Sequence, residues 1–245
     1  MLDPNARFLH GSTMSHVTRM TVTGMLGLTF MFVVDLANLF WISRLGDERM
    51  VAALGFAWNV QFFSISVGIG LMIAATALVS KAIGQGRREE ARRFATGCMA
   101  LGVCLQALVA ILIVMFRSKI VAFTGATGET ALLAERFLLI SVPTLPLMAI
   151  GMIGSAILRS EGDAYRAMFV TMSAGLVAVV ADPILIIWFD LGLDGAAINT
   201  GLSRLVSTLI AIWSVIRVHN LLGGLNLSII KVAFIPFLII ALPAI

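Results

Sequence analysis

The chain has 245 residues, of which 60% are hydrophobic and only 12% are charged. Its mean hydropathy of +1.02 excludes an ordinary soluble domain and indicates an integral membrane protein. The net charge of +4 does not indicate nucleic-acid binding, because the basic residues lie mainly between apolar runs, where such residues set the orientation in the membrane.

Six apolar runs recur along the chain, separated by short polar segments. Each run is long enough to cross a hydrocarbon core of about 30 Å as a helix, whereas a membrane β-barrel needs alternating strands. The sequence therefore predicts an all-α integral membrane protein, a bundle of six transmembrane helices followed by the start of a seventh. The predicted spans are residues 14–42, 51–80, 94–116, 132–157, 166–189 and 196–216.

Two prolines, Pro143 and Pro146, lie within the fourth predicted span. Proline has no backbone N–H, and its ring clashes with the preceding turn of a helix. We therefore expect the fourth helix to be interrupted near these residues.

The predicted domain organisation is a six-helix membrane lobe over residues 1–220, followed by a second segment over 221–245. The stretch 227–245 is apolar to its last residue and contains two prolines and a lysine. We expect it to form an interfacial helix and the start of a second lobe. On this interpretation the chain is a half-length fragment.

The distribution of basic residues predicts the orientation. Eleven Lys and Arg residues fall on the same side as the amino terminus and five fall on the opposite side. Because basic loops stay in the cytoplasm, we expect a multi-pass protein of the cytoplasmic membrane with a cytoplasmic amino terminus and the lipid bilayer as its surroundings. No cleavable signal peptide is expected, because the first apolar run is too long for one.

Asp35 and Asp182 are the two acidic residues that lie clearly within apolar runs. An ionised side chain at that depth costs about 2.5–3.5 kcal/mol or more and normally faces a protein interior or a cavity. Counted back from Trp41 and Phe189, each aspartate lies about 9–11 Å below the same interface. Thr200 reaches nearly the same level, so we expect the three polar groups to share a pocket that binds H⁺ or Na⁺, with Na⁺ held by the two aspartates.

Arg204 follows Thr200 by one helical turn and lies within the sixth span. It is a candidate ion-pair partner for an aspartate, or a contact for an anionic ligand. The role that we favour from the sequence is structural, either snorkelling of the side chain toward the interface or an ion pair. The alternative is purely structural, in which each aspartate pairs with a neighbouring span or caps backbone next to Pro183 and takes no part in transport.

Several segments, in this order and spacing, resemble the multidrug and toxic compound extrusion (MATE) family of secondary exporters. One departure is Ala178, where many relatives have asparagine one turn before the second aspartate. The similar segments are VVDLANLFWISRLGDERMVAALG at 33–55, LVSKAIGQGRREEARR at 78–93, ILRSEGDAYRAM at 157–168 and ADPILIIWFDLGLDGAAINT at 181–200.

The resemblance implies two six-helix lobes around a cavity that opens alternately to either side, of which this chain is similar to the first. It also implies that Asp35, Asp182 and Thr200 form the cation-coupling site. No organic cofactor is implied, only H⁺ or Na⁺ as the coupling ion. The expected partners are a small-molecule substrate and a second lobe or a second copy of the chain.

The resulting hypothesis is an antiporter that exports organic cations, drugs or other amphipathic compounds, and not an enzyme. One alternative is a flippase for lipid-linked precursors from the same superfamily. Another is an intramembrane aspartyl protease, whose Gly-x-Gly-Asp pattern is absent around both aspartates.

Overall fold

The computed structural model describes residues 13–223 and 227–244, and within these ranges the regular structure is entirely helical. Six helical segments in them are long and apolar enough to cross a membrane, which confirms the predicted all-α bundle. The elements are α1 (Thr13–Ser43), α2 (Glu48–Gly84), α3 (Arg88–Phe123), α4 (Gly128–Ser141), η2 (Val142–Thr144), α5 (Leu145–Ser160), α6 (Ala164–Pro183), η3 (Ile184–Trp188), α7 (Gly192–Trp213), η4 (Ser214–Val218), α8 (Leu227–Ala241) and η5 (Leu242–Ala244).

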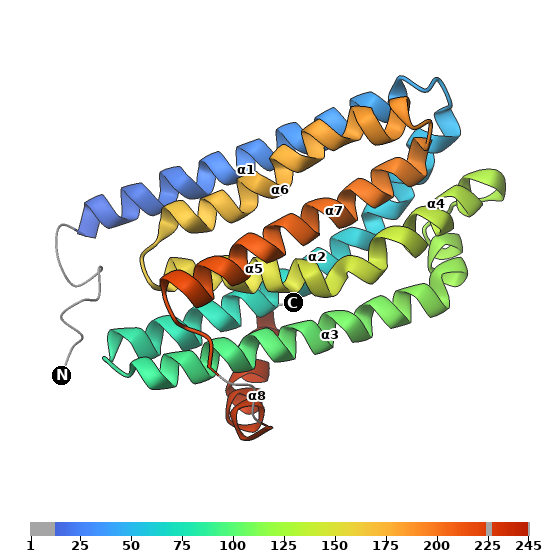
Figure 1. Cartoon of the computed structure of the whole chain (residues 1–245). Helices are drawn as coiled ribbons and strands as arrows, with labels where there is room; N and C mark the ends of the chain where they lie inside the picture. The colour runs from blue at the N-terminus through green and yellow to red at the C-terminus, as the bar shows by residue number, and fades with distance from the viewer. Residues whose placement is uncertain (1–12, 224–226, 245) are drawn as a thin grey trace.

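The spans lie side by side along one long axis (Figure 1). Helix α1 packs against α6, and α6 packs against α7. Helix α5 contacts α7 on one side and both α2 and α3 on the other, so it joins the two parts of the bundle. Helix α8 runs crosswise to this axis and packs against α2 and α3 (Figure 1). The proposed division of the chain near residue 220 stays a prediction.

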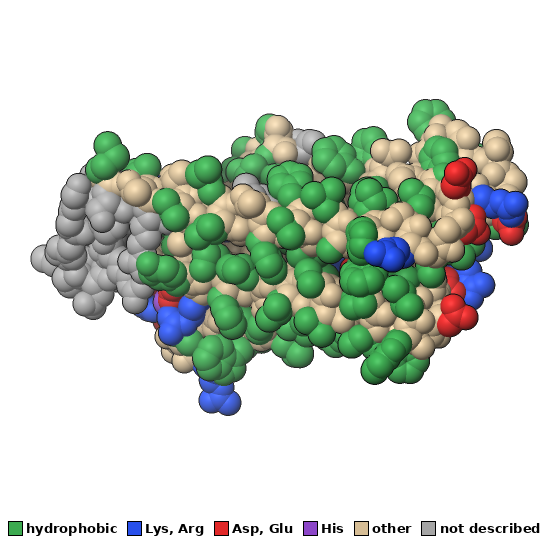
Figure 2. All heavy atoms as spheres, turned by 90° about the horizontal axis from the view of Figure 1, so that it is seen from above, with side chains coloured by type: hydrophobic (Ala, Val, Ile, Leu, Met, Phe, Trp, Pro, Cys, Tyr) green, Lys and Arg blue, Asp and Glu red, His purple; other side chains and the backbone are tan. Residues whose placement is uncertain are grey.

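The face of the bundle seen in Figure 2 is largely apolar, and the charged side chains visible there gather mainly toward the two ends. Large exposed side chains such as Phe62, Phe63 and Trp213 contribute to this apolar surface. The helices extend past the predicted limits; the third, for example, runs from Arg88 to Phe123 instead of 94–116. The backbone hydrogen bonds of the helix continue into the polar residues on either side of the apolar run. Hydropathy does not mark these helix ends, because their residues are not apolar. The chain is a multi-pass membrane protein.

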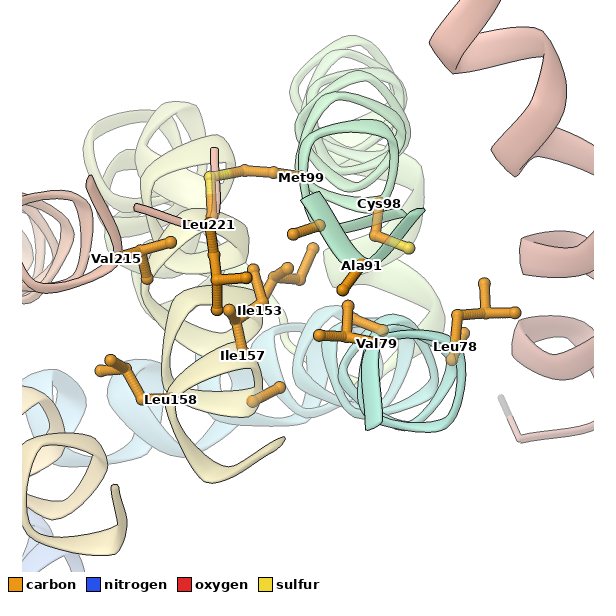
Figure 3. Close-up of a cluster of buried hydrophobic side chains, with 14 of the residues drawn as sticks. Leu78, Val79, Ala91, Cys98, Met99, Ile153, Ile157, Leu158, Val215 and Leu221 are labelled. Carbon is orange, nitrogen blue, oxygen red and sulfur yellow. The ribbon is translucent and has the colours of Figure 1, made fainter. Parts of the chain in front are cut away.

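The core is built largely from small and branched side chains. Figure 3 shows Leu78 and Val79 of α2, Ala91 and Cys98 of α3 and Ile157 of α5 within one buried cluster. Such side chains let helices approach closely, which is how membrane helices gain packing contacts without a hydrophobic driving force.

Prolines coincide with breaks in two spans. The fourth span is divided into α4, the 3₁₀ turn η2 and α5, with Pro143 within the turn and Pro146 just after it, as expected. The fifth span changes after Pro183 into the π-helix η3, which the sequence analysis did not predict. Both breaks release backbone groups and displace the side chains beside them.

The segment after η4 is attached to the end of the bundle that carries the α2–α3 turn. The ring Nε2 of His219 lies 3.1 Å from Asp163 Oδ2, and the Thr96 hydroxyl accepts a hydrogen bond of 2.8 Å from the Gly223 N–H. Asp163, between two spans, also forms an ion pair with Arg166. Burial raises the pKa of the Asp163 carboxyl, but hydrogen bonds from Arg166 and His219 lower it further, so the pKa lies below its ordinary value.

Gly195 gives a test of the close packing between η3 and α7. A Cβ at this position would lie 2.7 Å from the backbone oxygen of Leu185, which cannot easily move. We expect Gly195→Ala to destabilise the purified protein by about 1–3 kcal/mol, as overpacking does. Thermal unfolding in detergent measures the effect. Gly55→Ala is the matched control, because a Cβ there meets nothing within 4 Å; equal stability of the two variants would contradict the packing described.

Asp163 gives a test of the attachment of the segment after η4. A carboxyl whose pKa is lower in the folded than in the unfolded state stabilises the fold above the unfolded pKa, and this stabilisation is lost as the pH falls through the folded pKa. We therefore expect Asp163→Asn to lower the melting temperature at neutral pH, with a deficit that shrinks in acid. Melting curves recorded between about pH 3 and about pH 7 follow the deficit.

The control for this series is Asp190→Asn, which removes an exposed carboxylate that has no ion pair among the described residues. It should leave the melting temperature nearly unchanged throughout. A deficit for Asp163→Asn that stays constant down to the lowest pH would show that the carboxylate charge does not stabilise the attachment.

Candidate functional site

Asp182 lies at the end of α6, directly before Pro183, and its side chain is completely buried. Its Oδ1 accepts hydrogen bonds from the Nδ2 atoms of Asn38 on α1, at 3.0 Å, and Asn199 on α7, at 2.5 Å. Three helices from distant parts of the sequence therefore meet at one carboxylate. Asn199 also donates to the Ala178 carbonyl at 2.9 Å, which ties it more firmly to α6.

Two oxygens of this cluster have no hydrogen-bond partner among the described residues. They are Oδ2 of Asp182 and Oδ1 of Asn199, and both are buried. A buried acceptor without a donor is costly, and an ionised carboxylate in such surroundings is more costly still. A proton or a cation bound at Asp182 would remove this cost, so the cluster is a candidate cation site.

Asp35 takes no direct part in this cluster. Its side chain is exposed on α1 and has no hydrogen bond or ion pair within the part of the chain that the structure describes. It precedes Asn38 by three residues, so the two lie on the same side of α1. The link between α1 and Asp182 is thus made by Asn38, with Asp35 one turn away.

Thr200 also differs from its expected role. Its hydroxyl donates to the Ala196 carbonyl in its own helix, at 3.0 Å, and contributes no bond to Asp182. The neighbouring Asn199 occupies the expected position. Adjacent residues of a helix point about 100° apart, and the estimate of depth along the helix axis could not distinguish them. The sequence signal for the second donor is Asn38, a polar residue one turn after Asp35.

Arg204 forms no ion pair with a carboxylate among the described residues. Its Nη1 donates to the Ser141 carbonyl at 2.9 Å and to the Thr144 hydroxyl at 2.8 Å, and its Nη2 donates to Gln61 Oε1 at 2.6 Å. These acceptors come from α4, η2 and α2, so the guanidinium group joins α7 to the broken fourth span and to the second. The Asp182 and Arg204 networks are separate in their hydrogen bonds.

The structure describes no cluster of three or more His, Cys, Asp and Glu side chains suited to a metal ion within residues 13–223 and 227–244. A Na⁺ ion at Asp182 would be bound mainly by the carboxylate and amide oxygens. Such oxygen ligands suit a hard cation.

Asn199 and Thr200 give a test of which residue holds Asp182. Asn199→Leu removes a donor from a buried carboxylate, so we expect it to destabilise the protein by about 1–3 kcal/mol. Thr200→Val removes only a bond within one helix and serves as the matched control. Thermal unfolding in detergent compares the two, and an equal or larger loss for Thr200→Val would contradict the assignment.

Comparison with known proteins places this chain in a family. The family model described as MatE matches residues 23–184, well over half of the chain. The "Multidrug export protein MepA" of Staphylococcus aureus (strain bovine RF122 / ET3-1) is 26% identical over 187 residues, which cover 76% of this chain and 41% of that protein. An "FAD transporter" of Shewanella oneidensis is 27% identical over 209 residues, covering 83% and 46%.

Solved structures agree with the sequence comparison. The crystal structure of a MATE protein in complex with MaD3S superimposes with a TM-score of 0.87 at 25% identity, covering 100% of this chain and 55% of that one. The chain thus spans about half the length of the proteins it matches. From the extent of the family match and the shared fold, this chain belongs to the MatE family.

Proposed function

We propose that this chain is part of a secondary active antiporter that exports organic cations, drugs or other amphipathic compounds and is driven by influx of H⁺ or Na⁺. Membership of the family and the likeness to a protein named for multidrug export support the activity. The observation that carries the coupling is the buried Asp182 carboxylate with its unpartnered Oδ2. The proposal assigns no catalytic residue and no organic cofactor.

The coupling follows from the position of Asp182 between three helices. When the carboxylate is ionised, it holds the amides of Asn38 and Asn199 and so draws α1 and α7 toward α6. Binding of a proton or a cation weakens the attraction between the carboxylate and these donors. The relative stability of two arrangements of α1, α6 and α7 then depends on occupancy, and this dependence is what drives alternating access.

The free acceptors favour H⁺ as the coupling ion. A hard cation requires about six oxygen ligands, and the cluster offers two oxygens without partners among the described residues. A proton requires only the free Oδ2. Na⁺ remains the second candidate, with exposed Asp35 one turn along α1 as a further source of oxygen.

We propose a cytoplasmic-membrane location with a cytoplasmic amino terminus. The excess of basic residues on that side supports it, because basic loops are retained in the cytoplasm. The proposed working unit contains a second lobe or a second copy of this chain. The relatives, about twice as long, support this proposal.

The transport test uses vesicles that carry this chain in its complete working unit. The fluorescent organic cation ethidium is placed on one side, and an H⁺ or Na⁺ gradient is imposed. We expect a gradient of the coupling ion, H⁺ or Na⁺, to drive ethidium transport. Asp182→Asn should reduce this transport roughly 5- to 150-fold, the range of typical coupling energies. Asp35→Asn should reduce it less, because Asp35 does not contact Asp182 directly.

The matched control for charge is Asp190→Asn, an exposed loop residue, which should transport like the unaltered chain. Undiminished gradient-driven transport in Asp182→Asn, at equal insertion, would contradict the cation site. Movement of a fluorescent lipid-linked saccharide across the bilayer, without movement of ethidium, would instead support the alternative of a lipid-linked precursor flippase.

A further inference from the structure

Arg204 carries a positive charge deep within the bundle. It lies twelve residues into α7 from Gly192, about 18 Å along the helix and thus near the middle of a span of about 30 Å. At this depth its side chain cannot reach the interface by snorkelling. It points instead to acceptors on other helices, and it is half-buried.

The contacts of Arg204 orient its guanidinium group without neutralising it. All three acceptors, the Ser141 carbonyl, the Thr144 hydroxyl and the Gln61 amide oxygen, are uncharged. No carboxylate lies within 4.0 Å of it in the described ranges 13–223 and 227–244. Charged residues at membrane depth normally pair with an opposite charge or contact the pathway of a solute.

The break in the fourth span explains part of this arrangement. In an unbroken helix the Ser141 carbonyl would accept from the N–H of Leu145, which here bonds to Val142 instead. The freed carbonyl accepts from the Thr144 hydroxyl and from Arg204. Satisfying the Ser141 carbonyl requires only one N–H or O–H donor, which an uncharged side chain could supply. This structural role therefore does not explain why the residue carries a positive charge.

The remaining donors of Arg204 are suited to an anion. A guanidinium group has five N–H donors, and three of them are used by these acceptors. The two others are on Nε and Nη2, neighbouring nitrogens on one edge of the planar group. Such an edge binds two oxygens of a carboxylate or phosphate at once.

We propose that Arg204 binds an anionic group, a phosphate or a carboxylate, on the compound that the transporter carries. The inference rests on the proposed function and specifies its substrate class. Among the compounds carried, amphipathic molecules with an acidic group use this contact, and a purely cationic compound does not. Ser141, Thr144 and Gln61 are positioning residues that hold the guanidinium group in place.

The test compares flavin mononucleotide with riboflavin, two fluorescent probes that share a ring system and differ by one phosphate. Binding to the purified full chain in detergent is followed by fluorescence anisotropy. We expect the unaltered chain to bind flavin mononucleotide at least about tenfold more tightly, as expected of a hydrogen-bonded charged contact. A carboxylate-bearing pair, pyrenebutyrate and pyrenebutanol, distinguishes a general anion site from a phosphate site.

Two variants test whether Arg204 causes the preference for flavin mononucleotide over riboflavin. Arg204→Gln removes the charge and should bring the ratio of the two affinities to about one. Gln61→Glu keeps the size and the acceptor at 2.6 Å and supplies the missing negative charge, at the cost of one long donor bond of 3.4 Å to the Ser141 hydroxyl, so it should abolish the preference. Arg93→Gln, at an exposed position on α3, is the matched control and should keep the preference.

Equal affinity for both flavins in the unaltered chain would overturn the proposal, and so would a preference that survives in folded Gln61→Glu protein. If Arg204→Gln does not fold, Gln61→Glu still decides the question. Because binding requires no gradient, loss of transport with a retained phosphate preference would refute the antiporter proposal and leave the anion contact intact.

Discussion

The structure depends on one constraint, the cost of a charged group in apolar surroundings. Two such groups, Asp182 and Arg204, lie inside this bundle, and they do not pair with each other. Each is held instead by neutral groups from several helices. The carboxylate collects amide donors from α1 and α7, and the guanidinium group collects oxygens from α2, α4 and η2. Together the two clusters link α1, α2, α4, α6 and α7, so they help to determine how these helices meet.

Both charges lie at irregularities of the helices, and the association has a physical basis. Asp182 precedes Pro183 and the π-helix η3, and Arg204 contacts the carbonyl released beside Pro143. A proline removes a backbone donor and frees an acceptor in a medium without water. At Ser141 the break leaves a free acceptor, and Arg204 on α7 satisfies it. Regular helices offer no such site.

Helix α7 belongs to both clusters. Asn199 binds Asp182 and Arg204 binds the broken fourth span, and the two residues are five apart on the same helix. A shift of α7 therefore changes both sets of contacts together. Under the two proposals made above, this shared element gives a physical route by which occupancy at Asp182 would affect a ligand at Arg204, as the coupling of ion and cargo in an antiporter requires.

Much of the fold could be predicted from the sequence. Hydropathy over about 20 residues marks a span reliably, because an apolar segment in the bilayer satisfies its backbone hydrogen bonds by forming a helix. All six predicted spans are present. Pro143 and Pro146 correctly indicated the broken fourth helix. The π-helix after Pro183 was missed, because one extra residue per turn leaves no mark in the hydropathy pattern. The crosswise direction of α8 depends on its packing against α2 and α3.

The site was predictable only in part. The sequence by itself determined that the chain is a helical membrane protein, that it resembles a family of exporters and that Asp182 and Arg204 are charges in need of partners, because these conclusions depend on composition and on order along the chain. Only the tertiary structure decided that Asn38 and Asn199 bind Asp182, that Thr200 bonds within its own helix and that Arg204 has no carboxylate beside it among the described residues. The physical reason is rotation: depth follows from counting residues, but which side chain faces a partner depends on how each helix is turned about its axis when the bundle packs.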